Sequence, residues 1–575
     1  MRGQDPRLPG TTAVAGVPGW LFGPERSARA RRILLLLLFP ALIFVVTLRF
    51  DFVFDDNLVI LEDPLVVGPL NLRAIFRSQV RVVDVVLGYY RPLIALLYRA
   101  DWSLWGANPA GYHLTNLIWH LLATFLLYRL ALRTSGRVVV AWAAGMLFAV
   151  LPTHAEAIGW IQGRVDMVST ALLLLALLAL LRAKDESGWG SWRWASLGGL
   201  LFLVALLAKE SVAALPLAWA MWEVSTLGRG RWRERLAGPV SRLVPLGAAA
   251  LAYWAVRRAA VGALVGFPMS IFPVGQRLIA ITAVLGEYVR ILLVPAVSLN
   301  FHASLPAQAT PTSFLLGLMI AILFGGGLVA AWRGVRPFFP WIAWIPIMLL
   351  PPLLFTLYAS APAVGYYTTE RFLYLPSVGW CVLLGFMLAC PIERREGSTG
   401  ISWGMVTFGS IFVGYAGLLF LRLLPWADAV DLYLAMKAQP AMSEATRTFV
   451  ENDLGRIYLE REEFSAAQEE FQAALRLNPD YVLAHNNMGV LLIRQGKPAE
   501  AVRWLETAIR LDPTYGNSYG NLAAAFEAMG DLSAARRAYE AGLRIAPTST
   551  WLAKGLARVK AEDTGSSTLR TGTSR

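Results

Sequence analysis

Long apolar stretches recur throughout residues 33–424, and no other feature restricts the fold so strongly. The first of them, "ILLLLLFPALIFVVTL", carries no charge. A helix satisfies its own backbone hydrogen bonds without water, so stretches of this kind cross a bilayer as helices. From apolar length alone we predict about eleven such helices, near residues 33–50, 113–132, 138–153, 166–182, 194–208, 211–226, 243–260, 313–332, 338–358, 373–390 and 403–421.

Arg-rich segments alternate with the apolar stretches and predict their orientation. Cytoplasmic loops of membrane proteins are enriched in Lys and Arg, and such segments occur at 133–137, 182–193, 229–236, 332–336 and 392–397. The motif "RSARARR" before Ile33 predicts an uncleaved signal anchor, with residues 1–32 as a cytoplasmic tail. Segment 277–297 is apolar but contains Glu287 and Arg290. We therefore expect it to be re-entrant or to form the wall of an extracytoplasmic cavity.

Composition excludes several function classes. Hydrophobic residues make up 56% of the chain and charged residues 16%, which is too apolar for an ordinary soluble protein. The net charge of +13 is explained by loops beside anionic lipid, so we expect no nucleic-acid partner. Cys381 and Cys390 are the two cysteines and fall in one apolar stretch, which disfavours a disulfide. Because no His, Cys or carboxylate cluster has ligand spacing, we expect no metal.

Residues 425–562 have a different character and repeat every 34 residues. Prolines recur at positions 479, 513 and 547, and alanines at 467, 501 and 535. A period of 34 with small residues at helix crossings is typical of tetratricopeptide repeats. We predict three repeats near 452–484, 485–518 and 519–552, which form an α-solenoid, followed by a disordered tail at 563–575. The fold class is thus all-α, with a polytopic membrane domain over 33–424.

Repeats of this type bind peptides along a concave face, and four asparagines are candidates for that contact. Asn452, Asn486, Asn487 and Asn521 recur near the start of each repeat. They either hydrogen-bond the backbone of an acceptor protein or peptide, or they are solvated residues at helix starts.

Charged residues beside the apolar stretches gather on the side opposite the Arg-rich loops. Such residues mark functional sites in membrane proteins, and the candidates are Asp55, Asp56, His154, Arg164, Lys209 and Arg371. Each also has a simpler explanation. His154 caps a helix, Lys209 pairs with Glu210, Arg164 pairs with Asp166, or Arg371 reaches the lipid head groups.

Together these groups suit transfer from a phosphorylated lipid. Cations neutralise the charge that develops on a phosphate leaving group. A carboxylate takes the proton of an attacking hydroxyl. A single displacement with inversion at a sugar carbon needs only one such base.

Several motifs in order along the chain resemble one family. They are "FVFDDNLVI" (52–60), "NPAGYHLTNLIWHLL" (108–122), "FAVLPTHAEAIGWIQGRVDMVS" (148–169), "LLAKES" (206–211) and "ERFLYLPSVG" (370–379), followed by the repeats. On these residues the chain resembles the transmembrane and tetratricopeptide-repeat (TMTC) protein O-mannosyltransferases, within the GT-C glycosyltransferases.

The resemblance implies transfer of mannose or a similar hexose from a polyprenyl- or dolichyl-phosphate donor to Ser or Thr of exported proteins, with no other cofactor. It implies that Asp55 or Asp56, in the first extracytoplasmic loop, is the catalytic base. We hypothesise that His154, Arg164, Lys209 and Arg371 contact the donor phosphate. The active site and the repeats are then extracytoplasmic, in the periplasm or lumen.

Adjacent side chains point in different directions, so the two aspartates are expected to have different partners. We predict that Asp55 is the base and that Asp56 anchors the loop, either to backbone or to an arginine such as Arg91. Two other function classes stay open. One is a non-catalytic membrane scaffold whose repeats assemble envelope proteins, and the other is a transporter. The lack of an evident inverted repeat disfavours the transporter.

Overall fold

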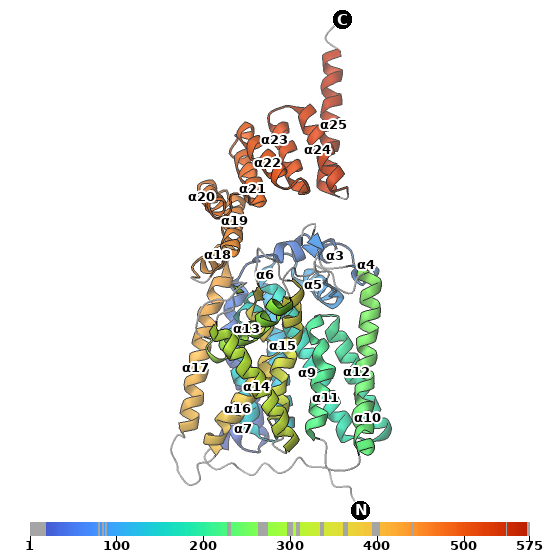
Figure 1. The fold of residues 1–575 in the computed structure, drawn as a ribbon, viewed down its shortest axis with the longest axis vertical. Coiled ribbons are helices and arrows are strands. Elements are labelled where there is room, and N and C mark those ends of the chain that lie inside the picture. Colours follow the sequence, from blue (N-terminus) through green and yellow to red (C-terminus); the bar gives the residue numbers. More distant parts are fainter. Residues whose placement is uncertain are drawn as a thin grey trace, which may run out of the picture. The chain divides into compact units, whose positions relative to one another are not determined.

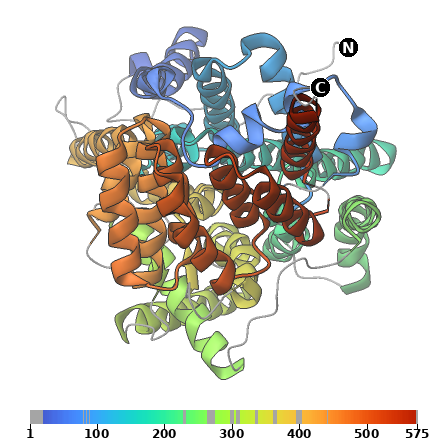
Figure 2. The same ribbon diagram turned by 90° about the horizontal axis from the view of Figure 1, so that it is seen from above.

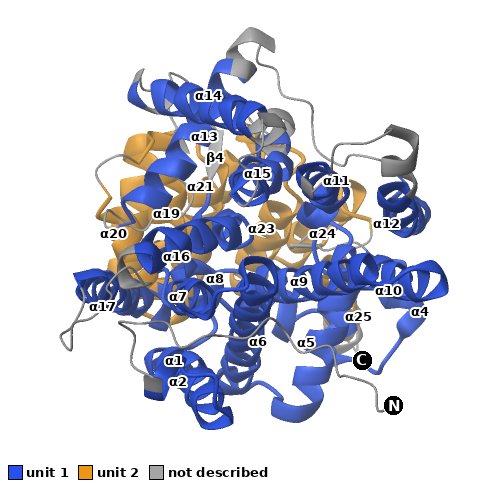
Figure 3. Ribbon diagram, turned by 90° about the horizontal axis from the view of Figure 1, so that it is seen from below, with its two compact units in different colours: residues 1–429 blue, residues 430–575 orange. Residues whose placement is uncertain are grey.

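The computed structural model describes residues 19–78, 81–82, 85–86, 89–226, 232–262, 274–295, 303–305, 311–333, 338–359, 366–393, 403–439, 442–547 and 549–571. The chain forms two compact units, residues 1–429 and residues 430–575, which are coloured separately in Figure 3. Each unit is described here by itself. Parts of the Arg-rich segments, at 227–231, 334–337 and 394–400, lie outside the described residues.

Unit 1 is a bundle of helices, most of which run roughly parallel in Figure 1 and are seen nearly end-on in Figure 2. Its helices are α1 (Gly19–Phe22), α2 (Arg26–Phe44), α3 (Pro64–Val67), α4 (Leu72–Ile75), α5 (Pro92–Trp105), α6 (Pro109–Ser135), α7 (Val138–Ala149), α8 (Ala155–Gly159), α9 (Arg164–Asp185), α10 (Gly188–Leu206), α11 (Leu215–Thr226), α12 (Trp232–Val261), α13 (Val274–Leu293), α14 (Pro311–Arg333), α15 (Phe339–Ala359), α16 (Ser377–Glu393) and α17 (Trp403–Leu423). Short turns of tighter or wider helix join them: η1 (Val45–Arg49), η2 (Asn57–Leu61), η3 (Pro152–His154), η4 (Ile161–Gly163), η5 (Glu210–Ala214), η6 (Glu370–Leu373) and η7 (Leu424–Ala427).

Local sequence sets the ends of these helices, as α6 illustrates. The side chain of Asn108 accepts a hydrogen bond from the Ala110 N–H, and Pro109 occupies the first helical position. At the other end Gly136 adopts a φ of 67°, the left-handed conformation that closes many helices. The 27 residues between them form one unbroken helix through the bundle.

Several helices are built to contact lipid. Within the described residues, five helices are long and apolar enough to cross a membrane, and the bent pair α7 and α8 makes a sixth if it forms one span. Leu42 on α2 and Val413 on α17 are 61% and 68% exposed, as expected of side chains that face lipid tails. Each of the eleven predicted segments contains a helix. Apolar helical stretches also occur in α14 (Phe314–Gly327), α15 (Phe339–Leu354) and α16 (Ser377–Cys390).

Segment 277–297, which contains Glu287 and Arg290, falls mostly within one continuous helix, α13. α13 runs unbroken from Val274 to Leu293, so this part of 277–297 contains no re-entrant turn, and the alternative that it forms a cavity wall stays a prediction. Its two charges lie one turn apart, and Arg290 Nη2 is 2.5 Å from Glu287 Oε1. Mutual neutralisation within the helix lets both groups remain in an otherwise apolar segment.

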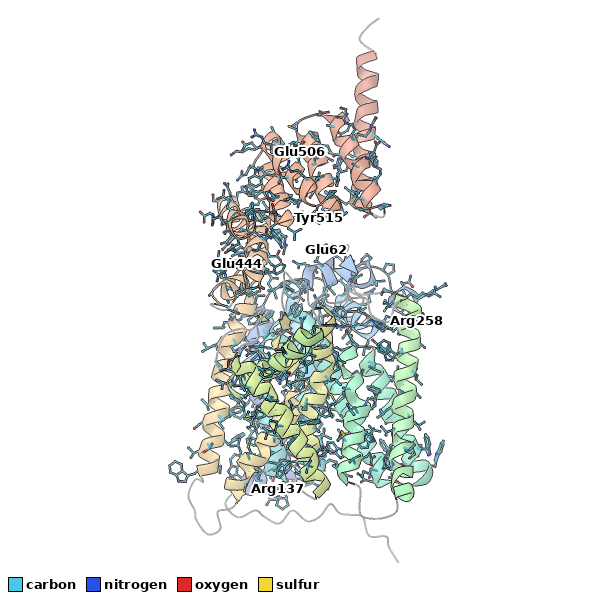
Figure 4. The ribbon with its side chains drawn as sticks, viewed as in Figure 1. Glu62, Arg137, Arg258, Glu444, Glu506 and Tyr515 are labelled. Atoms are coloured by element: carbon cyan, nitrogen blue, oxygen red, sulfur yellow. The ribbon has the colours of Figure 1, made fainter. Side chains whose placement is uncertain are left out.

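The two ends of unit 1 differ in the loops that they carry. In Figure 4, Glu62 and Arg137 lie at opposite ends of the bundle, and Arg258 near the end of α12 lies toward the Glu62 end. The loop with Asp55 and Asp56 therefore lies at the end opposite the Arg-rich turn after α6. This is the arrangement that the alternation of charge predicts.

Unit 1 also contains two small antiparallel sheets, which the all-α prediction missed. β1 (Arg81–Val82) pairs with β2 (Val85–Val86), and β3 (Ala303–Leu305) pairs with β4 (Tyr366–Thr368). The second sheet joins segments far apart in the sequence. Strands this short present no periodic pattern to recognise.

The first loop and the last helix of unit 1 are joined. The Asp51 N–H donates to the Ala427 carbonyl at 3.0 Å. Trp426, fully buried, packs against Gly159, where an added Cβ would lie 2.7 Å from the indole ring. Arg422 forms a buried ion pair with Glu370. These contacts connect the last turn of α17 and the residues after it to the end of the bundle that carries Asp55.

Unit 2 is a stack of helix pairs. After α18 (Ala429–Lys437) the pairs are α19 (Glu444–Glu460) with α20 (Phe464–Leu477), α21 (Val482–Arg494) with α22 (Pro498–Leu511), and α23 (Gly516–Ala528) with α24 (Leu532–Ile545), followed by α25 (Thr550–Thr571). The predicted small residues lie at the helix crossings: Ala467, Ala501 and Ala535 are fully buried. At Gly489 an added Cβ would lie 2.5 Å from the Leu505 side chain, which shows how closely the helices approach.

The C-terminal helix closes the stack and continues beyond it. Leu552 and Val559 of α25 are buried in the same cluster as Tyr539 of α24. The helix then runs on to Thr571, so most of the segment predicted to be a disordered tail is helical. Gly565 is the one strong helix breaker between residues 563 and 571, and a single glycine costs only about 1 kcal/mol.

Candidate active site

The loop that carries the two aspartates has unusual backbone geometry. Phe54, directly before Asp55, has a φ of 60°, a left-handed conformation that is rare for a bulky side chain. Asn57–Leu61 form one turn of π-helix directly after Asp56. Both features occur preferentially at functional sites, where surrounding packing maintains the strain. Here the Phe54 ring packs edge-on against Trp160, with centroids 5.7 Å apart.

Asp56 faces inward and closes the loop. Its side chain is fully buried, and Oδ2 accepts a hydrogen bond from the Val53 N–H at 3.2 Å. The Asp56 N–H in turn donates to the Val53 carbonyl at 3.1 Å. Burial and the neighbouring Asp55 charge raise the pKa of Asp56 well above its usual value. Asp56 is therefore bound to backbone, whereas Arg91, the arginine suggested as its partner, pairs with Glu210.

Asp55 has a different environment. The residue is partly exposed, but its Oδ1 is buried and accepts no hydrogen bond from the described residues. Burial raises the pKa of Asp55 to about 6, and the nearby Arg371 charge and the Gln162 amide oppose this shift. A carboxylate with an unoccupied oxygen and a pKa in this range is suited to accept a proton near neutral pH.

Arg371 is the cation whose charge lowers the pKa of Asp55. It lies in η6, and its guanidinium stacks 4.6 Å from the centroid of the Trp160 ring. Its side chain is 20% exposed. The guanidinium thus combines access to solvent with a place beside the Asp55 carboxylate. Of the four predicted phosphate contacts, it has the most accessible side chain.

Lys209 lies close to Arg371 but is paired. The two cations share one ring, since Lys209 Nζ and Arg371 Cζ are 5.1 and 5.7 Å from the centroid of Phe372. Lys209 forms a buried ion pair with Asp166, not with Glu210 as the sequence suggested. Glu210 instead accepts two hydrogen bonds from Arg91, at 2.9 and 3.2 Å. Burial lowers the pKa of Lys209, and the Asp166 charge opposes that change.

Arg164 does not face the site. Its side chain is fully buried, with Nη1 at 2.5 Å from Asp101 Oδ2, Nε at 2.7 Å from Asn116 Oδ1 and Nη2 at 2.9 Å from the Tyr112 carbonyl. All of these partners lie on α5 and α6. Arg164 therefore does not pair with Asp166, and its burial among these partners disfavours the predicted phosphate contact. Arg164 joins α9 to α5 and α6 through a buried ionic network.

His154 is also enclosed. The ring is fully buried, its Nε2 is 3.0 Å from Ser377 Oγ, and its centroid lies 4.4 Å from that of Tyr374. His120 joins the same cluster through a 2.8 Å contact between its Nδ1 and the Tyr374 hydroxyl. The imidazole is enclosed at the junction of η3 and α16, and this burial disfavours the predicted phosphate contact.

Sequence reasoning missed two residues beside Arg371. Glu156 is buried, and its Oε2 accepts a hydrogen bond from the Arg371 backbone N–H at 3.0 Å. Trp160 provides the surface on which the guanidinium stacks. Both lie within the motif "HAEAIGW". Nothing in this motif indicates that their partner is Arg371, which lies more than 200 residues later in the sequence.

A pocket borders the site. Its lining includes Val59, Asp63, Arg91, Tyr98, Gln162 and Val165. Gln162, which influences Asp55, therefore also faces this pocket. Among the described residues, no group of three His, Cys, Asp or Glu side chains has a metal-binding arrangement, and metal independence stays a prediction.

The four asparagines of unit 2 bond to one another. Asn487 Nδ2 donates to Asn452 Oδ1 at 3.0 Å, and Asn521 Nδ2 donates to Asn486 Oδ1 at 2.9 Å. Asn486 Nδ2 also lies 3.3 Å from Asn487 Oδ1. All four lie inside helices α19, α21 and α23, so the alternative that they are solvated helix-start residues is wrong. They form a ladder that joins successive repeats, and contact with an acceptor stays a prediction.

Comparison with known proteins bears on both units. Family models described as "Tetratricopeptide repeat" match residues 452–516 and 516–549. Protein O-mannosyl-transferase Tmtc1 of Drosophila melanogaster is 36% identical over 211 residues, which cover 35% of this chain and 24% of that protein. Protein O-mannosyl-transferase F38B6.6 of Caenorhabditis elegans is 24% identical over 474 residues, which cover 79% of this chain and 64% of that protein.

The chain is thus similar to proteins named protein O-mannosyl-transferases, and this similarity confirms the resemblance read from the motifs. The C-terminal unit contains tetratricopeptide repeats. The chain spans less than two thirds of the length of these curated relatives. Among solved structures, ArnT from Cupriavidus metallidurans bound to undecaprenyl phosphate is 15% identical, with a TM-score of 0.39 over 92% of this chain and 82% of that one.

Proposed function

We propose that the protein is an integral-membrane glycosyltransferase of the GT-C type that transfers a hexose, such as mannose, from a polyprenyl- or dolichyl-phosphate donor to Ser or Thr hydroxyls of exported proteins. The observation that carries this proposal is Asp55, a carboxylate with one unoccupied oxygen and a pKa of about 6, held beside the accessible cation Arg371. The names of the curated relatives support the reaction class.

In the proposed reaction, the acceptor hydroxyl oxygen attacks the anomeric carbon as the bond from that carbon to the phosphate oxygen breaks. The hydroxyl proton passes to Asp55, and the lipid phosphate leaves with the bonding electrons. One displacement inverts the anomeric centre, so a single carboxylate base is sufficient. No cofactor beyond the lipid-linked sugar takes part.

Arg371 and Lys209 are proposed to stabilise the leaving phosphate. Charge grows on that phosphate as the glycosidic bond breaks, and fixed cations stabilise it most when little water is present. Arg371 offers a partly exposed guanidinium, and Lys209 lies on the same Phe372 ring but must share its charge with Asp166. We therefore assign Arg371 the larger contribution. His154 and Arg164 are left out of the phosphate contact.

The site is proposed to face the periplasm or lumen, opposite the Arg-rich turn at Arg137. The repeats are proposed to bind the acceptor polypeptide on the same side. Three helix pairs lie between α18 and α25 in the described residues of unit 2, and their number sets the length of peptide that they can contact. The asparagine ladder is the proposed surface for an extended acceptor backbone.

The test is transfer of labelled hexose from a polyprenyl-phosphate donor in membranes that contain the wild type, Asp55→Asn or Asp56→Asn. Loss of a general base costs about 10²- to 10⁴-fold in rate, and we expect that loss for Asp55→Asn. Asp56→Asn should reduce transfer less, because an amide oxygen still accepts the Val53 N–H. Glu186→Gln is the control, since Glu186 forms an exposed pair with Arg182. Undiminished transfer by both aspartate variants would exclude Asp55 and Asp56 as the base.

A second function is favoured by the repeat match: a membrane scaffold that recruits envelope proteins without catalysis. Purified protein that turns over no donor, yet retains a partner through residues 445–561, would support the scaffold. Loss of a hexose from a defined Ser or Thr in cells that lack the protein would support the transferase.

A further inference from the structure

We propose that Glu156 is a positioning residue that fixes Arg371 in the orientation needed to contact the phosphate of the lipid donor. This inference rests on the proposed function, because it assigns Arg371 to the donor phosphate. It concerns a residue whose place in the site is known only from the structure.

Glu156 contacts Arg371 with both carboxylate oxygens, one through a hydrogen bond and the other through a longer ionic contact. Oε2 accepts the Arg371 backbone N–H at 3.0 Å, and Oε1 lies 3.7 Å from Arg371 Nε. One side chain therefore constrains both the start of η6 and the guanidinium. Glu156 is 2% exposed, so water competes little for either contact.

The same short helix constrains the guanidinium from a second direction. α8 spans Ala155–Gly159, with Glu156 in its first turn and Trp160 directly after its end. The Trp160 ring lies 4.6 Å below the Arg371 guanidinium. A carboxylate against Nε and an aromatic face beneath the plane leave few rotamers available. Glu156 contacts the backbone N–H and Nε of Arg371 and forms no hydrogen bond with Nη1 or Nη2. These two nitrogens can therefore point toward a phosphate.

α8 is itself held rigidly. An added Cβ at Gly159 would meet the Trp426 ring at 2.7 Å, and one at Gly163 would meet the Ala157 carbonyl oxygen at 2.0 Å. This close packing fixes the backbone of α8. A fixed backbone holds the Glu156 carboxylate in place, and the carboxylate in turn holds Arg371. A pre-oriented cation has less entropy to lose when it binds the anion.

A simple counter-ion and a positioning residue predict opposite results. If Glu156 only neutralises Arg371, its removal frees a positive charge and tightens binding of an anion. If Glu156 orients Arg371, its removal weakens binding. The sign of the change in affinity therefore distinguishes the two roles.

The experiment measures binding of undecaprenyl phosphate to the full chain in detergent, for the wild type, Glu156→Ala, Glu156→Gln, Arg371→Ala and the control Glu186→Ala. We expect Arg371→Ala and Glu156→Ala to weaken binding, the latter about tenfold. Glu156→Gln keeps an oxygen for the Arg371 N–H and should recover most of the affinity. Glu186→Ala should match the wild type. Each variant is first checked for a wild-type elution profile and melting temperature.

A second measurement follows the pH dependence of transfer. Arg371 lowers the pKa of Asp55, so a displaced guanidinium lets that pKa rise. The acid limb of the pH–rate profile should move to higher pH in Glu156→Ala, in the same direction as in Arg371→Ala. General loosening of the fold lowers the rate without moving the limb.

The outcomes separate the inference from the function on which it rests. Unchanged or tighter binding by folded Glu156→Ala, while Arg371→Ala loses affinity, overturns the positioning role and leaves the phosphate contact in place. Unchanged binding by Arg371→Ala overturns the phosphate contact and the inference with it. Absence of hexose transfer by the wild type, with the expected order of affinities preserved, contradicts the transferase but supports the positioning of Arg371.

Discussion

The two units differ in how their polar side chains find partners. In unit 2, Asn452 bonds Asn487, Asn486 bonds Asn521, and Arg494 donates to the Leu459 carbonyl, each pair separated by 35 residues. In unit 1, the site is assembled from pairs 43 to 215 residues apart, such as Lys209 with Asp166 and Arg371 with Glu156. Repetition places equivalent partners one repeat apart, whereas a membrane bundle joins residues that share no period.

The difference predicts where single substitutions have their largest effect. In unit 1 a cation and its carboxylate form an isolated buried network, so the loss of one member leaves a charge without compensation. In unit 2 each asparagine is one step in a ladder with other steps beside it. The following predictions test this comparison, from the largest expected effect to the smallest.

Breaking the buried network of Arg164 should be the most damaging change. Arg164→Ala leaves Asp101 buried without its partner, and we expect unit 1 to lose about 3–5 kcal/mol of stability. The measurement is unfolding of the purified protein in detergent. Arg182→Ala is the control, because its pair with Glu186 is exposed and is worth at most about 0.5 kcal/mol.

The Arg164 prediction also has a double-mutant form. Arg164→Ala combined with Asp101→Ala should cost less than the sum of the two single changes, because the double variant leaves no unpaired charge. Additive losses would show that the two side chains do not form the network described here.

Matched glycine substitutions compare the packing of the two units. At Gly163 an added Cβ lies 2.0 Å from a backbone oxygen, which cannot move aside, whereas at Gly489 it lies 2.5 Å from the flexible Leu505 side chain. We expect Gly163→Ala to cost about 3 kcal/mol and Gly489→Ala about 1 kcal/mol. Thermal unfolding of both variants measures the difference, and equal losses would contradict it.

The pH dependence of transfer should follow the pKa of Asp55. Because the base must be unprotonated and its pKa is raised to about 6, activity is expected at neutral pH and should be lost as pH falls through this value. Below it the rate should fall about tenfold per pH unit. The ratio kcat/KM measured from pH 4.5 to 8 tests this. A rate that stays constant down to pH 4.5 would argue for an unperturbed carboxylate.

A step of the asparagine ladder should contribute least to stability. Asn487→Ala removes one hydrogen bond between repeats and the longer one from Asn486 Nδ2, and we expect a loss of about 1 kcal/mol. Glu506→Ala on α22 is the control, because this side chain is exposed (Figure 4). The measurement is chemical unfolding of the full chain followed by fluorescence. A loss above about 3 kcal/mol would show that Asn487 contributes as much as a member of a buried ionic network in unit 1, which contradicts the comparison.

The sequence predicts much of the fold and only part of the site. Apolar length locates the helices, and the period of 34 locates the repeats and their buried alanines, because both signals are local or periodic. The motif around Asp55 and Asp56 is recognisable, and their adjacency predicts unequal surroundings. The partners of Arg164, Lys209 and Arg371 were not predictable, since each ion pair depends on which helices pack together.

The missed residue Glu156 illustrates the same limit. Beside His154 it reads as an ordinary surface carboxylate at the start of a short helix. Its function as a partner of Arg371 depends on the packing of α8 against η6, which no spacing in the sequence reports. The number of charged residues near a candidate site therefore says less about their roles than the ion pairs that they form in the fold.

The hydrogen bond between Asp51 and Ala427 has a consequence for biosynthesis. A ribosome adds about 5–20 residues per second, so the loop with Asp55 leaves it tens of seconds before its partner segment after α17 exists. During that interval the strained backbone at Phe54 has neither Trp160 in its final place nor the Ala427 carbonyl to hold it. A nascent chain therefore cannot carry an assembled site until the last membrane helix has been inserted. We therefore expect that chains halted in translation before that point do not carry out the proposed transfer.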